Sequence, residues 1–452
     1  MATESSIMDS NSFKEEYASM LSPKTREMIS KREKYLGGAY RLFYRKPLNI
    51  VRGEGDYLWD GEGNKYLDMY NNVAGVGHCN PAVVEAVTEQ MKTLNTHTRS
   101  RYLHEKILDY SEELLELMPD EINKIMYMCT GSEANDLALR VAEAYTGGTG
   151  IIITQEAYHG TSALTSGCSP SLGAGQPLLP NVRLITAPDY YRHGGTPEEF
   201  TAWYASEMQK TIDELNEAGY KFSCFLADSI FSSDGIYPDP VGFLKATVDV
   251  VHKNGGVFIA DEVQPGFART GQAFFGFARH GIVPDMITMG KPMGNGIPIS
   301  GLAAKEDVLA AFSDKLPYFN TFGGNPVSIA AAQAVLKYIK DENLQEHCKK
   351  AGGALLKALK EVQERHPESV GDVRGAGLFL GFEFVKNDGN KTPDKDMALN
   401  VIEMLRDEHI LTSVIGHYGN ILKLRPPMVF SENDIDWFAT SLDKCITKLE
   451  NK

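Results

Sequence analysis

Short apolar runs alternate with segments of helical periodicity between about residue 122 and residue 290. The runs expected to form strands are 125–129, 150–154, 182–186, 224–227, 257–260 and 286–289. Between the first two, Leu137, Val141 and Ala144 recur at helical spacing. This alternation is typical of βαβ units, and uninterrupted apolar runs favour parallel strands buried on both faces. The pattern predicts an α/β fold with a mostly parallel, doubly wound sheet.

The flanking regions show an alternating pattern instead. After a polar arm that extends to about residue 35, apolar positions alternate in 48–51, 57–59 and 66–69, and Gly and Asp turns separate these runs. They predict a small antiparallel meander. Apolar alternation returns in 378–384, where we expect another strand.

The composition is that of an ordinary globular protein and argues against several functions. Of the 452 residues, 42% are hydrophobic and 23% are charged, and the formal net charge is −15. So acidic a chain is not expected to bind nucleic acid or anionic membrane surfaces. The N-terminal segment lacks the features of a signal peptide, and no apolar run approaches the ~18 residues of a membrane span. We therefore expect a cytoplasmic protein.

The cysteines and histidines do not indicate a metal site. The six cysteines are scattered without CxxC spacing, and the eleven histidines form no HExxH motif. This pattern favours reduced thiols over disulfides or zinc ligands, and we expect no metal.

Two of the expected strands are followed by charged side chains that could take part in catalysis or binding. The run 257–260 is followed by Asp261 and Glu262, and the run 286–289 is followed by Gly290 and Lys291. Ligands of open α/β sheets bind at the carboxyl ends of the strands. Asp261 and Lys291 are therefore candidate neighbours across one pocket.

A carboxylate and a lysine in such a pocket suit one cofactor. A buried carboxylate needs a positive partner, which a pyridinium nitrogen would supply, and a lysine among apolar groups can form an imine with an aldehyde. Both requirements are met by pyridoxal phosphate. The alternative is that Asp261 caps a helix and Lys291 is a solvated loop residue.

Two further motifs fit the same cofactor. Thr130, Gly131 and Ser132 precede a helical segment, and a Gly/Ser turn at a helix N-terminus can bind phosphate, although Ser132 could equally be a helix cap. After the second expected strand, Tyr158 or His159 could stack on a flat ring, although each could also be a packing residue.

Six motifs connect these residues to a known family. They are GHCNP, TGSEANDLALRVA, AYHG, ADEVQPGFARTG, MGKPMGNG and FNTFGGNP. In this order and at these distances the chain resembles, from about Leu48 to the C-terminus, the class III aminotransferases, which are pyridoxal-phosphate enzymes of fold type I. The resemblance implies an N-terminal arm and meander (1–70), a large cofactor-binding domain (71–330) and a small α+β domain (331–452).

The resemblance also implies how pyridoxal 5'-phosphate is held. The implied residues are Lys291 as the Schiff-base lysine, Asp261 as the partner of the pyridinium nitrogen, Gly131 and Ser132 at the phosphate, Tyr158 stacked on the ring, Gln264 near the ring hydroxyl and Thr321 at the phosphate of the neighbouring subunit. The role of Thr321 implies a homodimer with shared active sites.

The chain departs from glutamate-using relatives where they handle an α-carboxylate. In place of an EPxxGEGG-type segment it has DSIFSSDG, with Asp228 for the first Glu and Ser233 for the later one. Lys423 stands at the position of an Arg, and a lysine does not reproduce the bidentate fork of arginine. A glutamate-dependent transaminase is therefore not expected, although Arg425 could compensate.

Within the family the chain resembles the branch of ethanolamine-phosphate phospho-lyase and of ammonia-lyases for hydroxylated aminoethylphosphonate. The motifs of this branch are YRLF, NNVAGVGHC, GSEANDLALR, YFNTFGG and NILKLRPPM. The chain departs from it at Ile297, where relatives often have His, and in a segment around Arg101 that is two residues longer than in the phospho-lyases.

These features predict a lyase that releases aldehyde and ammonia from a small 1,2-amino alcohol bearing phosphate or phosphonate. An ω-aminotransferase is the alternative reaction, and a non-catalytic ligand-binding protein is the alternative of another class. The candidates for binding the substrate anion are Arg41, Arg101 and Lys423, and for each of them a surface salt bridge is an equal alternative.

Overall fold

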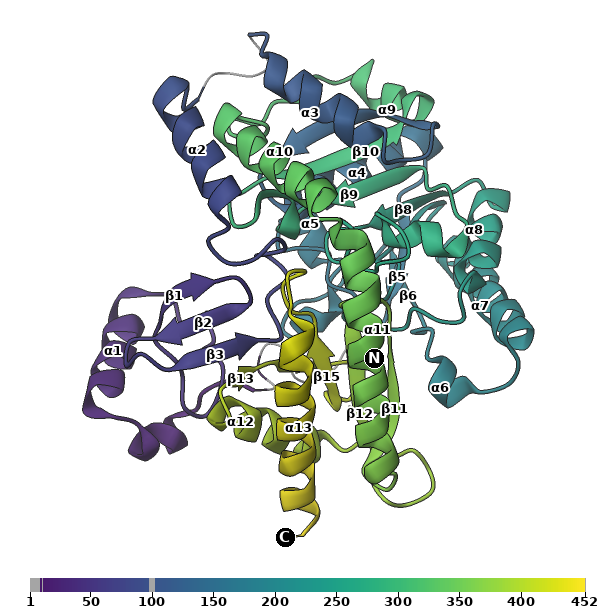
Figure 1. Ribbon diagram of the computed structural model, residues 1–452. Coiled ribbons are helices and arrows are strands. Elements are labelled where there is room, and N and C mark those ends of the chain that lie inside the picture. The colour runs from purple at the N-terminus through teal and green to yellow at the C-terminus, as the bar shows by residue number, and fades with distance from the viewer. Residues whose placement is uncertain (1–8, 10, 97–101, 452) are drawn as a thin grey trace.

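The centre of the molecule is a seven-stranded sheet. A computed structural model describes residues 9, 11–96 and 102–451 (Figure 1). The strands of this sheet, in spatial order, are β4 (Ile122–Met128), β10 (Ser300–Lys305), β9 (Met286–Met289), β8 (Val257–Asp261), β7 (Phe222–Ala227), β5 (Gly150–Thr154) and β6 (Val182–Ile185). Only the two pairs formed by β10 are antiparallel. The predicted α/β class with a mostly parallel sheet is therefore confirmed.

Helices cover both faces of this sheet because its strands are apolar on both sides. Phe225 of β7 and Phe258 of β8 belong to a buried cluster with α7 (Pro197–Glu217) and α8 (Phe243–Lys253). The next residues along the same strands, Leu226 and Ile259, belong to a second cluster. That cluster includes α4 (Gly131–Thr146) and α9 (Glu306–Ser313). On the first side, α10 (Pro326–Asp341) packs against α2 (Pro81–Thr93) and α3 (Glu105–Leu115).

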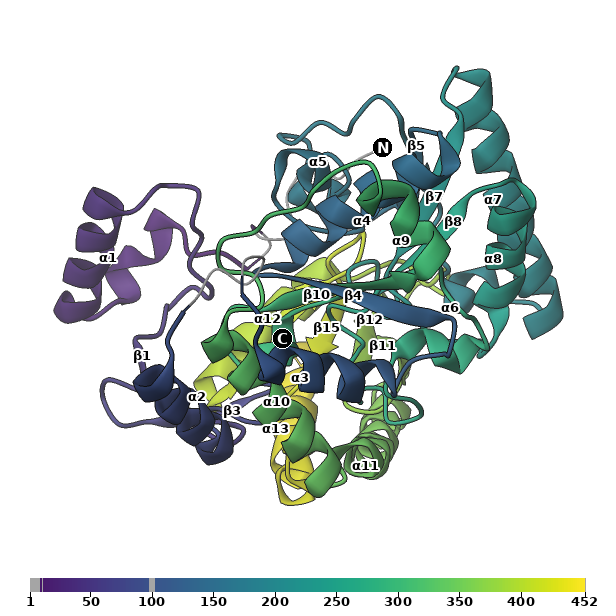
Figure 2. The ribbon, with the colours of Figure 1, turned by 90° about the horizontal axis from the view of Figure 1, so that it is seen from above.

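Two smaller sheets lie beside the large one. The meander consists of β1 (Ile50–Glu54), β2 (Tyr57–Asp60) and β3 (Lys65–Asp68), which pair antiparallel as predicted. Its last strand also pairs in parallel with β13 (Ile410–Leu411), which comes from the C-terminal part of the chain. Helix α1 (Pro23–Tyr35) precedes the meander and stands away from the rest of the molecule when viewed from above (Figure 2).

The second small sheet is antiparallel throughout. Its strands, in spatial order, are β11 (Val370–Gly375), β12 (Leu380–Phe384), β15 (Ile421–Leu424) and β14 (Ser413–Ile415). The helices of this region are α11 (Leu344–Arg365), α12 (Lys395–Asp407) and α13 (Ile435–Glu450). Since β15 leads directly to Arg425, this sheet determines where Lys423 and Arg425 lie relative to the large sheet.

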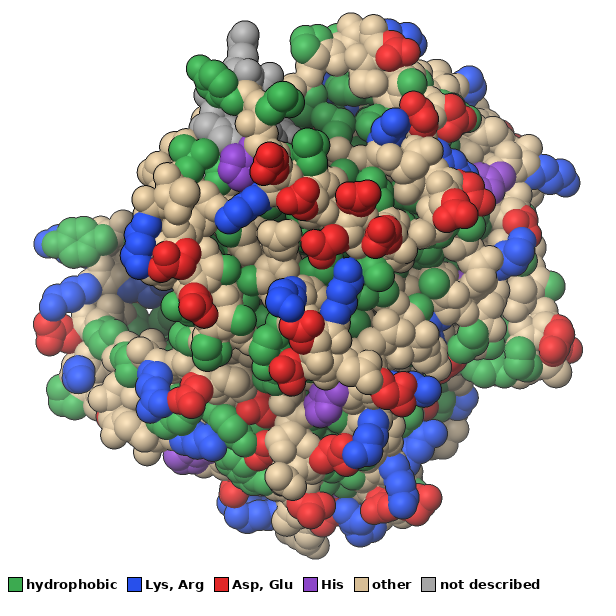
Figure 3. All heavy atoms as spheres, turned by 45° about the horizontal axis from the view of Figure 1, so that its top comes forward, with side chains coloured by type: hydrophobic (Ala, Val, Ile, Leu, Met, Phe, Trp, Pro, Cys, Tyr) green, Lys and Arg blue, Asp and Glu red, His purple; other side chains and the backbone are tan. Residues whose placement is uncertain are grey.

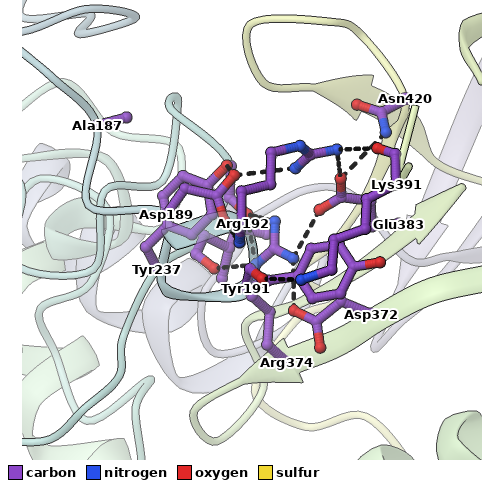
Figure 4. A network of polar contacts seen from close by, with 12 residues as sticks. Ala187, Asp189, Tyr191, Arg192, Tyr237, Asp372, Arg374, Glu383, Lys391 and Asn420 are labelled. Carbon is purple, nitrogen blue, oxygen red and sulfur yellow. Dashed lines mark hydrogen bonds and ion pairs between the residues drawn. The ribbon is translucent and has the colours of Figure 1, made fainter. Parts of the chain in front are cut away.

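A network of buried charges joins the second small sheet to the large domain (Figure 4). Glu383 on β12, fully buried, pairs with Arg374 on β11 (2.8 Å) and with Arg192 on the short helix α6 (Tyr190–His193). Arg192 also pairs with Asp189 (2.9 Å), and Arg374 with Asp372 (2.7 Å). Although burial opposes it, these contacts raise the pKa of both arginines above the ordinary value.

On the face shown in Figure 3, acidic and basic side chains are interspersed. Within the described residues, no helix is long and apolar enough to cross a bilayer. The same part of the chain contains no cluster of three or more His, Cys, Asp or Glu side chains that could hold a metal, and none of its six cysteines forms a disulfide.

Candidate active site

A cavity of about 160 Å³ lies where β8 and β9 end. These strands are parallel neighbours, so Asp261, the last residue of β8, and Lys291, which follows β9, reach the same edge of the sheet. The cavity brings together most of the residues predicted to hold a cofactor. These are Gly131, Ser132, Tyr158, Asp261, Gln264 and Lys291.

Asp261 is held as a buried carboxylate. Its Oδ2 accepts hydrogen bonds from Asn135 Nδ2 (2.9 Å) and contacts His159 Nδ1 (2.7 Å), and its Oδ1 accepts one from the N–H of Val263 (3.1 Å). Burial acts to raise the pKa of Asp261, but the contacts with His159 and Asn135 and the charge of Lys291 outweigh it and lower the pKa. Asp261 therefore stays ionised and can pair with a protonated ring nitrogen.

Two residues around Asp261 have roles that the sequence did not predict. Asn135 lies on α4 one turn after Ser132, and Thr288 Oγ1 donates a hydrogen bond to its Oδ1 (2.7 Å). The amide N–H groups of Asn135 then donate to Asp261 and to the carbonyl oxygen of His159 (each 2.9 Å). His159 is buried against Asp261, so it supports the carboxylate, whereas its neighbour Tyr158 is 37% exposed and lines the cavity. Asn135 could have been identified from the sequence as a polar residue one helical turn after the Gly/Ser turn.

Lys291 has the properties of a reactive amine. It begins a short 3-10 helix, η5 (Lys291–Gly294), with a φ of 28°, in the left-handed region where a side chain is strained. Burial and the nearby charge of Arg425 lower the pKa of Lys291 to about 8, although Asp261 and Asp228 oppose the shift. Part of the lysine population is therefore neutral near physiological pH, as imine formation requires.

The opposite end of the cavity is suited to an anion. Thr130 caps α4 and forms a reciprocal capping box with Glu133, so the first turn begins at Gly131 and Ser132, where N–H groups and the helix dipole favour phosphate. Gly160 lies against this turn with a φ of 139°, and a Cβ there would come within 2.5 Å of Ser132 Oγ. This close approach leaves no room for a side chain at Gly160.

The cavity thus has an anion-binding helix end, a flat aromatic ring, a low-pKa carboxylate and a low-pKa amine. These groups fit the phosphate, the ring, the ring nitrogen and the aldehyde of pyridoxal 5'-phosphate, respectively.

A second cavity, of about 220 Å³, adjoins the first and shares Tyr158, Gln264 and Lys291 with it. Its lining includes Ser233, Lys423 and Arg425, so two of the positions at which the chain departs from glutamate-using relatives meet here, whereas the third, Asp228, lines the first cavity. The other described lining residues are Phe43, Tyr70, Ser171, Leu172, Ser413, Val414 and Ile415.

The second cavity is rich in positive charge. Lys423 is 5% exposed and Arg425 is 7% exposed. Burial and the charges of Arg425 and Lys291 lower the pKa of Lys423 well below its ordinary value, and Asp228 opposes the shift. Lys291, Lys423 and Arg425 therefore converge on a space that an anionic substrate group could enter, and an anion there would favour the protonated form of Lys423.

Three of the predicted residues lie elsewhere. Arg41 is exposed in the N-terminal arm, forms an ion pair with Asp9 (2.6 Å) and lines neither cavity. Thr321 is exposed in the loop before α10 and also lines neither cavity. Arg101 lies outside the described residues.

The fold and this cavity define an enzyme of the pyridoxal 5'-phosphate-dependent, fold type I class. Comparison with protein-family models gives the particular family: the model of "Aminotransferase class-III" matches residues 43–446, and the chain belongs to this family.

The relatives within the family carry two kinds of name. The chain is 38% identical, over 93% of its length and 87% of the relative's, to an alanine–glyoxylate aminotransferase 2-like protein of Drosophila melanogaster. It is 35% identical, over 93% of both chains, to ethanolamine-phosphate phospho-lyase homolog 1 of Caenorhabditis elegans. A phospholyase from Arthrobacter, solved in complex with phosphoethanolamine, has 37% identity and a TM-score of 0.88, with 93% of this chain and 99% of that chain covered.

Proposed function

We propose that the protein is a lyase for a small 1,2-amino alcohol that bears phosphate or phosphonate, such as ethanolamine phosphate or 1-hydroxy-2-aminoethylphosphonate. The observation that carries the proposal is the second cavity, in which Lys423 and Arg425 lie beside Lys291 while Ser233 replaces an acid. The similarity to a phospholyase solved with phosphoethanolamine supports the same substrate class.

The charge of the second cavity favours a dianionic group over a single carboxylate. Charge-assisted hydrogen bonds to phosphate are about twice as strong as neutral ones, and Lys423 and Arg425 can each donate them. Ser233 and Ser413 add hydroxyl donors to the same lining. A glutamate side chain at position 233 would instead neutralise part of this charge and compete with the substrate anion.

The proposed reaction uses three groups of the chain. When bound, the cofactor supplies an electron sink for the carbon that carries the amine. Lys291 takes the proton from that carbon, Asp261 keeps the ring nitrogen protonated, and Lys423 with Arg425 holds the substrate anion. Loss of phosphate or hydroxide from the adjacent carbon, followed by hydrolysis, gives the aldehyde and ammonia.

The proposal is tested by measuring whether the substrate amino group is released as ammonia when no keto acid is present. Purified holoenzyme is incubated with ethanolamine phosphate or 1-hydroxy-2-aminoethylphosphonate and no keto acid, and ammonia is measured. Release of ammonia in large molar excess over the enzyme supports the lyase. Strict dependence on pyruvate or 2-oxoglutarate contradicts it and supports the ω-aminotransferase, which the similarity to the alanine–glyoxylate aminotransferase 2-like protein favours.

We further propose that two copies of the chain form a homodimer with shared sites, in which Thr321 reaches the cofactor phosphate of the partner. Phe319 and Phe322, on either side of Thr321, are 59% and 63% exposed, and aromatic side chains are enriched at interfaces. Light scattering on the holoenzyme gives the oligomeric state. A monomer that is fully active would contradict this proposal.

A further inference from the structure

Arg425 lines the second cavity and reaches the first cavity through its contact with Gln264. It follows β15 and is anchored by its backbone N–H and its Nε, which donate to the carbonyl oxygens of Met69 and Tyr70 (each 2.8 Å). Its Nη1 donates to Gln264 Oε1. It therefore extends from the small sheet to the loop that follows Asp261, and Gln264 in turn lines both cavities.

The chemistry of arginine fixes the orientation of the Gln264 amide. A guanidinium group has only donors, so the atom of Gln264 that faces it is the carbonyl oxygen. The Nε2 group must then point away from Arg425, and it makes no hydrogen bond within the described residues. The backbone of Gln264 is fixed as well, because Asn72 Nδ2 donates to its carbonyl oxygen (3.1 Å).

We infer that Arg425 is a positioning residue that presents the Gln264 amide as a donor to the ring hydroxyl oxygen of the cofactor. A lysine at position 425 would keep the charge, but it lacks the fork that contacts Tyr70, Asn72 and Gln264 together. The inference concerns the cofactor and holds whether the enzyme is a lyase or an aminotransferase.

The expected consequence is a change in the acidity of the cofactor-bound Lys291 nitrogen. With the cofactor bound, the ring oxygen would share the proton of that nitrogen. A second hydrogen-bond donor to the oxygen would weaken the hold of the oxygen on this proton and would lower the apparent pKa of the nitrogen. Loss of the Gln264 donor should raise this pKa by about one unit, because a hydrogen bond to a charged group is lost.

A double-mutant cycle tests the inference through the pH dependence of the visible absorbance of the loaded, substrate-free enzyme. Gln264→Ala and Arg425→Lys should each raise the apparent pKa, and the double variant should match Gln264→Ala alone. Arg192→Lys, the same substitution in the network of Figure 4, is the matched control and should leave the pKa unchanged.

Two results would overturn the inference. One is an Arg425→Lys enzyme with the wild-type pKa, and the other is a double variant in which the two shifts add. Should Arg425→Lys fail to fold, a crystal structure of the loaded wild-type enzyme decides. Gln264 Nε2 within hydrogen-bond distance of the ring hydroxyl supports the inference, and any other placement of Nε2 refutes it.

Discussion

Two clusters of buried charge lie on neighbouring strands of the second small sheet, and their carboxylates are distributed differently. In the network of Figure 4, Arg192 and Arg374 share Glu383 and each has a further carboxylate, so the pKa of both arginines is raised. In the active-site cavities, the pKa values of Lys291 and Lys423 are lowered. The arginines of the first cluster form ion pairs within the chain, whereas Lys291 and Lys423 form no ion pair among the described residues and keep lowered pKa values. A buried amine without a directly paired carboxylate is thus a sign of function here.

The largest expected effect is on catalysis at Lys291. Replacing it with alanine removes the amine and the base together, so turnover should fall by about a thousandfold or more. Steady-state assays measure the loss, and circular dichroism checks that the variant is folded. Undiminished turnover in the folded variant would contradict the catalytic assignment of Lys291.

Glu383→Ala should produce the next largest effect, on stability. It takes the fully buried shared carboxylate from two partly buried arginines, each of which keeps one further carboxylate, so the cost should be about 3 kcal/mol. Denaturant unfolding measures the change. Glu54→Ala, which breaks the exposed pair with Arg52, is the matched control and should cost less than about 1 kcal/mol. Equal losses for the two variants would remove the distinction between the network and a surface pair.

Lys423→Met should affect binding without a comparable loss of stability. The methionine fills similar space without a buried charge, so the free energy of unfolding should stay the same or rise. For a phosphorylated substrate, kcat/KM should fall by about 10- to 100-fold because one charge-assisted hydrogen bond is lost. An unchanged kcat/KM would show that Arg425 alone, or another residue, binds the anion.

The smallest expected effect is on the pH dependence of stability of the cofactor-free protein. The pKa of Lys291 is lowered from the ordinary lysine value of 10.5 to about 8 in the folded state, so the unfolded chain binds more protons between these two pH values. Stability contributed by this group should therefore rise as the pH increases from about 8 to 10.5, by about 1 kcal/mol for a partly exposed side chain. Lys291→Met should lack this rise. Parallel stability profiles for the two proteins would contradict a lowered pKa.

Most of the central sheet could be predicted from local patterns. Strands β5 and β9 have the predicted bounds, and the other four predicted strands differ by one to three residues at an end. The antiparallel strand β10 was not predicted. Its sequence, SGLAAK, consists mainly of small residues and has a single large apolar residue, Leu302, so it lacks the apolar run by which the other strands are recognised.

The site could be predicted only in part, because motifs identify residues but not their partners. Gly131, Ser132, Tyr158, Gln264, Asp261 and Lys291 were named from motifs, and the fold brings them around one cavity. The contact of Arg425 with Gln264 joins residues that are 161 positions apart, and no local pattern encodes it. The placement of Arg41 with Asp9 depends likewise on how the N-terminal arm folds back.

The parallel pairing of β3 with β13 has a consequence for how the protein is made. The meander near the start of the chain gains its fourth strand only when residues 410 and 411 have left the ribosome. Roughly 340 residues of synthesis separate the two partners, which is about 20–70 s at typical rates of 5–20 residues per second. During that interval the edge of β3 is unpaired and available to chaperones or to a second nascent chain.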